Sequence, residues 1–317
     1  MSDSPKISVV MSVYNSQQYL HEAIDSILNQ SFKDFEFIII DDASTDSSAE
    51  IIKSYTDPRI KYHKNEHNLG LTKSLNKAIK LSESSYLARM DADDISLQKR
   101  LERQYLYLIN HEDIAVVGTF GTLIDENGKE KDKISAALSP EEISAALVFY
   151  NQFIHSSVLY RKKVIVEAGL YNEEYKKAQD YELWLRLLSL DHKMVNLEES
   201  LVLYREHNES ISVKTSQAQN DFSIDATEWF LEKKLKIHIM KKYIANYKKL
   251  ILKHEKIDIF SFMATLKAMR VIFDAFKIEF NNEKSINYFI NCLDIIVNTE
   301  FKSSSMRSVC KKFLGIN

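Results

Sequence analysis

Buried-strand and helix patterns alternate along the first 90 residues, and no other feature limits the fold of this chain as strongly. Apolar runs predict four strands, and the segments between them repeat apolar residues with helical spacing. The strands are predicted at 7–13, 35–40, 60–63 and 86–90, and the helices at 19–29, 44–55 and 72–81. Such alternation is typical of an α/β fold with a mostly parallel central sheet flanked by helices. In these sheets ligands bind beyond the carboxyl ends of the strands.

Polar residues stand at three of those strand ends. Tyr14-Asn15, Asp41-Asp42 and Asp91-Ala92-Asp93-Asp94 each follow an apolar run, so we expect them to meet in one crevice. Mg²⁺ and Mn²⁺ prefer carboxylate oxygens and keep open positions for phosphate oxygens. The third cluster therefore predicts a divalent-cation site that grips a diphosphate, with Asp91 and Asp93 flanking the metal. The alternative is an acidic N-cap, because Asp93 or Asp94 could cap a helix that begins near Leu97.

Glycine, cysteine and hydropathy exclude several classes of protein. None of the six glycines begins a G-x-G-x-x-G fingerprint or a G-x-x-x-x-G-K-[ST] loop, so neither phosphate-binding loop is supported. Cys292 and Cys310 are too few for a disulfide framework and are not spaced as a metal pair, which suits a reducing cytosol. No apolar run approaches about 18 residues, and the first residues do not read as a secretory signal. We therefore expect a cytoplasmic protein.

The pattern changes beyond residue 96. The sequence predicts a helix at 97–110, strands at 114–122 and 156–160, helices at 161–168 and 180–190, and only helices from about 217 onward. We therefore expect a domain over 1–215, with halves at 1–95 and 96–215, and a helical C-terminal region over 216–317.

Charge is concentrated near the C-terminus. The formal net charge is −3, yet residues 230–317 contain 17 Lys and Arg against 8 Asp and Glu. Basic amphipathic helices can lie on an anionic membrane, which makes the inner face of the cytoplasmic membrane an alternative location. A solvated lysine surface over a packed core is the plainer interpretation. The sequence contains no recognisable nucleic-acid module or zinc-finger spacing, so no nucleic-acid partner is predicted.

Seven short motifs occur in a fixed order along residues 5–212. They are ISVVMSVYN at 7–15, IIDDASTD at 39–46, NLGL at 68–71, ARMDADD at 88–94, HSSV at 155–158, QDYELW at 179–184 and YREH at 204–207. Together they resemble the family-2 glycosyltransferases with the GT-A fold, of the bacterial surface-polysaccharide type. Two positions depart from the family pattern, which usually has Pro where Ser12 stands and Glu where Gln179 stands.

The resemblance implies an inverting transfer of a sugar from a nucleotide-sugar, usually a UDP-sugar of the GlcNAc, GalNAc, Glc or Gal type. The acceptor would be a hydroxyl of a glycan or lipid-linked glycan in lipopolysaccharide, capsule or other surface-polysaccharide biosynthesis. It also implies a divalent cation, Mn²⁺ or Mg²⁺. Residues 1–95 would then bind the nucleotide-sugar, and residues 96–215 would bind the acceptor.

The resemblance also implies roles for single residues. Asp180 matches the general base that takes a proton from the acceptor hydroxyl. Asp93 matches a direct metal ligand, Asp91 a contact to the metal or ribose, and His207 a residue that completes the metal or phosphate site. Asp42 would accept from the uracil ring, Val13 and Tyr14 would line the base pocket, and Lys73 and Asn76 would reach the ribose or diphosphate. The complete donor-binding set is Val13, Tyr14, Asn15, Asp42, Ser44, Lys73, Asn76, Arg89, Asp91, Ala92 and Asp93.

Several residues keep plainer alternatives. Asp180 could cap a helix, Asp42 could belong to a turn, and His207 could be a surface histidine. Arg89 suits phosphate but could instead pair with Asp91 or Asp94. Acceptor contacts are predicted at His155, Tyr181 and Trp184, with a structural histidine and a core tryptophan as the alternatives.

Two other functions remain open at this point. A nucleotidyltransferase that makes the nucleotide-sugar also needs paired carboxylates and a metal, but it would normally have a Gly-rich, basic loop where Tyr14-Asn15-Ser16-Gln17 stands. A non-catalytic glycan- or nucleotide-binding module would use the carboxylates only as surface residues, and Asp180→Asn would leave its function intact.

Overall fold

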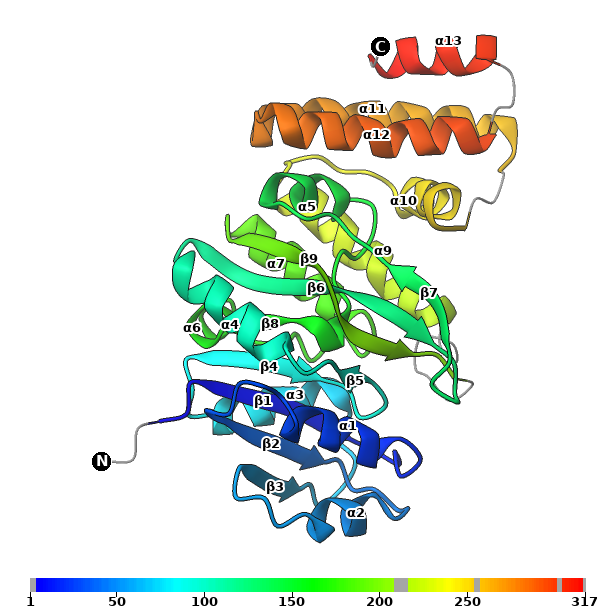
Figure 1. Ribbon diagram of the computed structural model, residues 1–317. Helices are drawn as coiled ribbons and strands as arrows, with labels where there is room; N and C mark the ends of the chain where they lie inside the picture. The colour runs from blue at the N-terminus through cyan, green and yellow to red at the C-terminus, as the bar shows by residue number, and fades with distance from the viewer. Residues whose placement is uncertain (1–3, 208–215, 254–256, 301–303, 316–317) are drawn as a thin grey trace. The chain divides into compact units, whose positions relative to one another are not determined.

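The chain forms two compact units in a computed structural model that describes residues 4–207, 216–253, 257–300 and 304–315 (Figure 1). The first unit takes residues 1–138, 153–183 and 192–215, and the second takes 139–152, 184–191 and 216–317. The long segment of the second unit begins where the sequence predicted the helical region. Two short segments that were predicted within the first domain also belong to the second unit.

Nine strands form one mixed sheet in the first unit, in the order β3-β2-β1-β4-β8-β6-β9-β5 with β7 paired to β6. The neighbours β3, β2, β1 and β4 are parallel, as the alternation predicted. β8 is antiparallel to both β4 and β6, so the second half of the sheet is mixed. The strands are β1 (Ile7–Val13), β2 (Phe35–Asp41), β3 (Ile60–Lys64), β4 (Tyr86–Met90), β5 (Ile95–Ser96), β6 (Ile114–Ile124), β7 (Glu130–Ile134), β8 (Leu159–Arg161) and β9 (Lys193–Arg205).

Helices of the first unit cover both faces of this sheet. Leu20 and Ile24 of α1 and Leu101 of α4 share a core cluster with Val9 and Met11 of β1. α3 packs against β1 and β2, and alternate strand residues supply its contacts on the opposite face. The helices are α1 (Leu20–Leu28), α2 (Ser48–Ser54), α3 (Leu71–Leu81), α4 (Arg100–Asn110), α6 (Lys162–Glu167) and the first part of α7 (Gln179–Ser189), with the 3₁₀ turn η1 (His155–Ser157).

Two sequence-based boundaries were wrong. The helix predicted from residue 97 begins at Arg100, because Ile95 and Ser96 first pair with β9 as the short strand β5. The strand predicted at 156–160 is η1 followed by β8, since the Ser156 side chain turns inward to bond Asp94. β7, β9 and α5 were not predicted at all. β9 has a polar middle at Glu198-Glu199-Ser200 and its register with β6 shifts, which hides the two-residue period of a strand.

Within the described residues, the regular elements of the second unit are all helices. Its core includes phenylalanines with tilted rings: the ring centre of Phe289 lies 4.8 Å from that of Phe149 and 4.7 Å from that of Phe276. None of the helices in the described ranges is both long enough and apolar enough to cross a membrane. The elements are α5 (Pro140–Ala146), the end of α7, α9 (Ser216–Lys233), α10 (Lys241–Lys248), the π-helix η2 (Lys249–Lys253), α11 (Ile259–Phe280), α12 (Glu283–Glu300) and α13 (Ser304–Leu314).

Candidate active site

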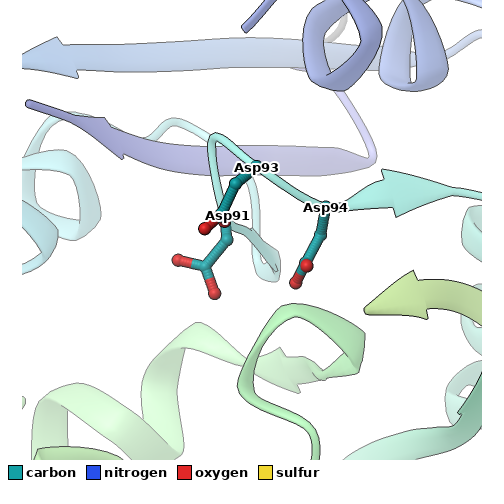
Figure 2. A group of neighbouring side chains, drawn as sticks. All are labelled: Asp91, Asp93 and Asp94. Atoms are coloured by element: carbon teal, nitrogen blue, oxygen red, sulfur yellow. The ribbon is translucent and has the colours of Figure 1, made fainter. Parts of the chain in front are cut away.

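Three aspartates gather on the loop between β4 and β5. β4 lies parallel to β1 with Met90 opposite Met11, so the loops after both strands leave the same edge of the sheet. Figure 2 shows Asp91, Asp93 and Asp94 on this loop, and one carboxylate oxygen of each lies within 4.8 Å of the others. The three carboxylates of the predicted cation site therefore lie together beyond the end of β4. The convergence of the three strand ends in one crevice stays a prediction.

Asp94 has a structural role within this group. It is buried and accepts hydrogen bonds from Ser156 Oγ and from the backbone N–H of Arg205, the latter at 2.8 Å. Burial raises the pKa of Asp94 well above its ordinary value, and the neighbouring Asp93 and Asp91 raise it further. No aspartate caps the next helix, because α4 is preceded by Lys99. The N-cap alternative is therefore wrong.

Asp91 and Asp93 are the partly exposed carboxylates of the loop, with 29% and 32% of their side chains exposed. His207 Nε2 lies 3.0 Å from Asp93 Oδ2, and the His207 ring lies 4.9 Å from the ring of Tyr19. Carboxylate oxygens with one imidazole nitrogen are a ligand set that suits Mn²⁺ or Mg²⁺. The residues present thus fit a divalent cation: Asp91 and Asp93 share the loop, and His207 contacts Asp93. The trio Asp91, Asp93 and His207 stays a prediction as a ligand set.

Arg89 is only 1% exposed, so it does not face a ligand directly. Its guanidinium pairs with Asp91, which is the alternative that the sequence left open. Burial raises the pKa of Asp91, Arg89 opposes this shift, and the nearby Asp93 and Asp180 add to it. Arg89 is therefore a buried cation that pairs with Asp91. The prediction that Arg89 contacts the donor directly is corrected.

Arg205 is a residue that sequence reasoning quoted in a motif but gave no role. Its backbone N–H reaches Asp94, its Nε donates to the carbonyl of Asp93 at 2.9 Å, and its Nη2 pairs with Glu22. The guanidinium also lies 4.4 Å from the ring centre of Tyr19. One almost fully buried side chain thus ties the acidic loop to α1 and to the end of β9.

Arg205→Met should lower the free energy of unfolding by about 2–3 kcal/mol, because it removes the charge-assisted bond to the partly buried Asp93 carbonyl and the ion pair with Glu22. Urea denaturation followed by circular dichroism measures this change. Arg205→Lys keeps the charge without the planar fork and should recover only part of the loss. A loss under about 0.5 kcal/mol for the methionine variant would contradict the role given to Arg205.

Hydrogen bonds join the ends of β1 and β2 where the nucleotide is predicted. Asn15 Oδ1 accepts from Thr45 N at 2.8 Å, and Ser44 Oγ accepts from Asn15 N at 3.1 Å. Tyr14 is 50% exposed, whereas Val13 and Ala92 are buried. The side chains of Tyr14 and Asn15 are therefore accessible at this edge. Those of Val13 and Ala92 are not.

The carboxylate of Asp42 accepts hydrogen bonds from the turn that precedes α3. Its Oδ1 accepts from Asn65 Nδ2 at 2.7 Å and from Leu69 N at 2.8 Å, and its Oδ2 accepts from Gly70 N at 2.8 Å. The side chain is buried. Its predicted bond to uracil stays a prediction, since a carboxylate offers about four acceptor positions and three donors use them here.

The two α3 residues of the donor set differ in exposure. Lys73 lies on the exposed side of the helix. Asn76 is buried, and its amide bonds the backbone of Tyr171 and the side chain of Glu173. Asn76 therefore does not reach outward to a ribose or diphosphate in this structure, and the prediction of a direct donor contact is corrected.

Asp180 lies in the first turn of α7, since the helix begins at Gln179. Burial is the largest cause of the raised pKa of Asp91 and of Tyr171, and the Asp180 charge contributes to both shifts. Asp180 is therefore within electrostatic range of the acidic loop. The candidate base and the candidate metal ligands belong to the same compact unit.

The three predicted acceptor contacts lie deeper than expected. His155 Nε2 lies 2.8 Å from Tyr171 Oη, and burial together with Arg89 lowers the pKa of His155 well below its ordinary value. His155 is therefore a neutral imidazole near pH 7. Tyr181 and Trp184 are 2% and 0% exposed, so their rings belong to the core rather than to an acceptor-stacking surface. The structural alternatives hold for His155 and Trp184.

Comparisons with known proteins show which proteins this chain is similar to. The family model described as glycosyl transferase family 2 matches residues 8–167. The O-antigen biosynthesis glycosyltransferase WbnJ of Escherichia coli is 37% identical over 72% of this chain and 90% of its own length. An uncharacterized glycosyltransferase of Methanocaldococcus jannaschii is 40% identical over 64% of this chain and 71% of its own length.

Among solved structures, TarS 1–349 of S. aureus in complex with UDP-GlcNAc superposes with a TM-score of 0.63 at 17% identity. The alignment covers 94% of this chain and 93% of the TarS chain. This likeness shows the fold, and the GT-A fold that the motifs implied is confirmed.

Proposed function

The chain belongs to glycosyl transferase family 2 and is a glycosyltransferase, and from this premise we propose that it moves a sugar from a UDP-sugar to a hydroxyl of a surface glycan with inversion at the anomeric carbon. The observation that carries the proposal is the group of Asp91, Asp93 and Asp94 beyond β4, whose carboxylate oxygens lie within 4.8 Å of one another, in a chain that has Asp180 in the first turn of α7. Residues 1–95 are assigned to the donor, and residues 96–215 to the acceptor.

The acidic loop is the proposed diphosphate site. Asp91, Asp93 and His207 would hold Mn²⁺ or Mg²⁺, which when bound offsets the negative charge that develops on the departing diphosphate. Hydrogen bonds from Arg205 to Asp94 and to the Asp93 carbonyl stabilise the conformation of the loop. Arg89 compensates part of the negative charge of Asp91. This division leaves Asp91 and Asp93 as the two carboxylates of the loop that face outward.

Asp180 is the proposed general base. Its carboxylate takes the proton of the acceptor hydroxyl while the hydroxyl oxygen forms a bond to the anomeric carbon. The bond from that carbon to the diphosphate oxygen breaks, and its electron pair leaves with the UDP. One displacement of this kind inverts the anomeric centre and needs no covalent enzyme intermediate.

The exposed Tyr14 and Asn15 support a base pocket at the ends of β1 and β2. TarS, which shares the fold, was solved with UDP-GlcNAc, and WbnJ is named for O-antigen biosynthesis. We therefore propose a UDP-N-acetylhexosamine or UDP-hexose as donor and a glycan or lipid-linked glycan as acceptor.

A panel of UDP-, GDP-, CMP- and dTDP-sugars with Mn²⁺, Mg²⁺ or EDTA tests the donor. We expect metal-dependent turnover of one UDP-sugar with UDP as the released nucleotide, and NMR of the product should show the inverted anomer. Release of pyrophosphate in a parallel reaction that offers UTP and a sugar 1-phosphate would instead identify a nucleotidyltransferase. Binding of a nucleotide-sugar without any turnover would identify a binding module.

The second unit is the proposed contact to an anionic membrane. Lys233, Lys236, Lys242 and Lys249 are exposed, and Met240 among them is 48% exposed. Lys234 and Lys241, in contrast, are paired with Asp191 and Asp225. Flotation should show binding to phosphatidylglycerol vesicles at low salt and none to phosphatidylcholine vesicles. Absence of binding to both would favour the solvated lysine surface.

A further inference from the structure

The backbone of Tyr171 is held by one side chain from another element. Asn76 Oδ1 accepts from Tyr171 N at 3.0 Å, and Asn76 Nδ2 donates to Tyr171 O at 2.9 Å. The same Nδ2 lies 3.2 Å from Glu173 Oε1. Asn76 is 3% exposed and Tyr171 is 1% exposed. The amide therefore satisfies both backbone groups of a buried residue, as a neighbouring strand would.

A second bond from α3 reaches the same segment. Thr72 Oγ1 donates to the carbonyl of Tyr175 at 3.2 Å. Thr72 and Asn76 are four residues apart and hence lie on one side of the helix. Segment 171–175 is therefore attached along α3 by side chains, although the two are about a hundred residues apart in sequence.

This segment leads directly into the helix that carries Asp180. Leu170 before it and Ala178 after it have φ of 65° and 53°, a conformation that costs energy for residues other than glycine. The carbonyl of Ala178 accepts from Glu182 N at 3.0 Å and so begins the hydrogen bonding of α7. On the opposite side, the Tyr171 hydroxyl bonds His155 of η1. Strained ends with fixed contacts between them indicate a loop of defined shape.

We propose that Asn76 is a positioning residue, which attaches loop 170–178 to the donor-binding half and thereby sets the place of Asp180 relative to the acidic loop. This inference rests on the proposed function. A general base acts only within hydrogen-bond reach of the acceptor hydroxyl, and a displacement of about 1 Å can cost about 10²-fold in rate. Asn76 thus acts on the transfer step rather than on donor affinity.

Asn76→Asp is the sharpest variant because it keeps the size and the acceptor but removes both N–H donors. Its carboxylate also faces the Tyr171 carbonyl and Glu173. We expect kcat for transfer to fall about 10–100-fold, while KM and Kd for the UDP-sugar change by less than about threefold. Tyr171→Phe and Thr72→Val, which each remove one bond to the loop, should shift kcat in the same direction. Lys80→Ala, on the exposed side of α3, is the matched control.

Hydrogen exchange of peptides covering 170–178 supplies a readout that does not depend on activity. Exchange there should become faster in Asn76→Asp and in Thr72→Val, and should stay unchanged in Lys80→Ala. Weaker donor binding with an unchanged kcat would overturn the inference, because Asn76 would then contact the donor. Unchanged kcat and exchange in both Thr72→Val and Tyr171→Phe would also overturn it, even if Asn76→Asp failed to fold. If the wild-type protein turned over no nucleotide-sugar, the proposed function would be contradicted, and not the role of Asn76 alone.

Discussion

Asp93→Asn is expected to reduce sugar transfer by about 10²–10³-fold, because the partly exposed Asp93 is the carboxylate of the loop that also contacts His207. The amide keeps the size of the side chain but removes the charge that holds the cation. Metal assistance is worth several kcal/mol, and each 1.36 kcal/mol corresponds to about a tenfold change in rate. UDP-sugar turnover measured across a Mn²⁺ titration should show both a lower maximum and a higher half-saturating concentration.

Asp132→Asn is the matched control, since Asp132 is an exposed aspartate on β7. Its rate and metal dependence should equal those of the wild type. EDTA should abolish wild-type turnover, and added Mn²⁺ or Mg²⁺ should restore it. Wild-type turnover by Asp93→Asn, with an unchanged metal requirement, would remove Asp93 from the site.

Asp180→Asn should lower kcat by about 10²–10⁴-fold, the usual contribution of a positioned general base. Donor affinity should stay within about threefold of the wild type, because the base acts on the acceptor hydroxyl. Isothermal titration with UDP and single-turnover transfer separate the two effects. The fall in rate should persist at saturating donor and saturating acceptor.

The same variant separates catalysis from a role at the start of α7. Asp180 lies within the first turn, after Gln179, so a carboxylate that only favoured this helix end would cost about 0.3–1 kcal/mol of stability when neutralised and would leave kcat intact. Glu167→Gln, on the exposed surface of α6, controls for the loss of one negative charge in this unit. Equal kcat for Asp180→Asn and Glu167→Gln would rule out the assigned base.

The first half of the fold was predictable because its signals are local. β1, β2 and β4 are almost wholly apolar runs, and α1 and α3 repeat their apolar residues at helical spacing. The structure confirms each of these elements within a few residues at either end. β9 escaped prediction because it carries Glu198, Glu199 and Ser200 at its middle and bulges against β6. Such a strand is stabilised by its partners rather than by its own pattern.

The candidate site was predictable to a similar extent. The acidic loop is visible in the sequence because its carboxylates follow directly after an apolar strand. Burial, however, is set by residues far away in the chain. Arg89 and Asn76 have the chemistry of phosphate and ribose contacts, yet tertiary packing turns both inward onto Asp91 and Tyr171. The importance of Arg205 likewise appears only when β9 meets the β4–β5 loop.

The most direct test of the central claim is the coupling between metal and nucleotide. UDP should bind the wild-type protein at least about tenfold more tightly with Mn²⁺ than with EDTA, and UDP should tighten Mn²⁺ binding by the same factor. In Asp93→Asn this mutual effect should vanish. Equal UDP affinity with and without Mn²⁺ in the wild type would contradict a metal-dependent donor site on Asp91 and Asp93.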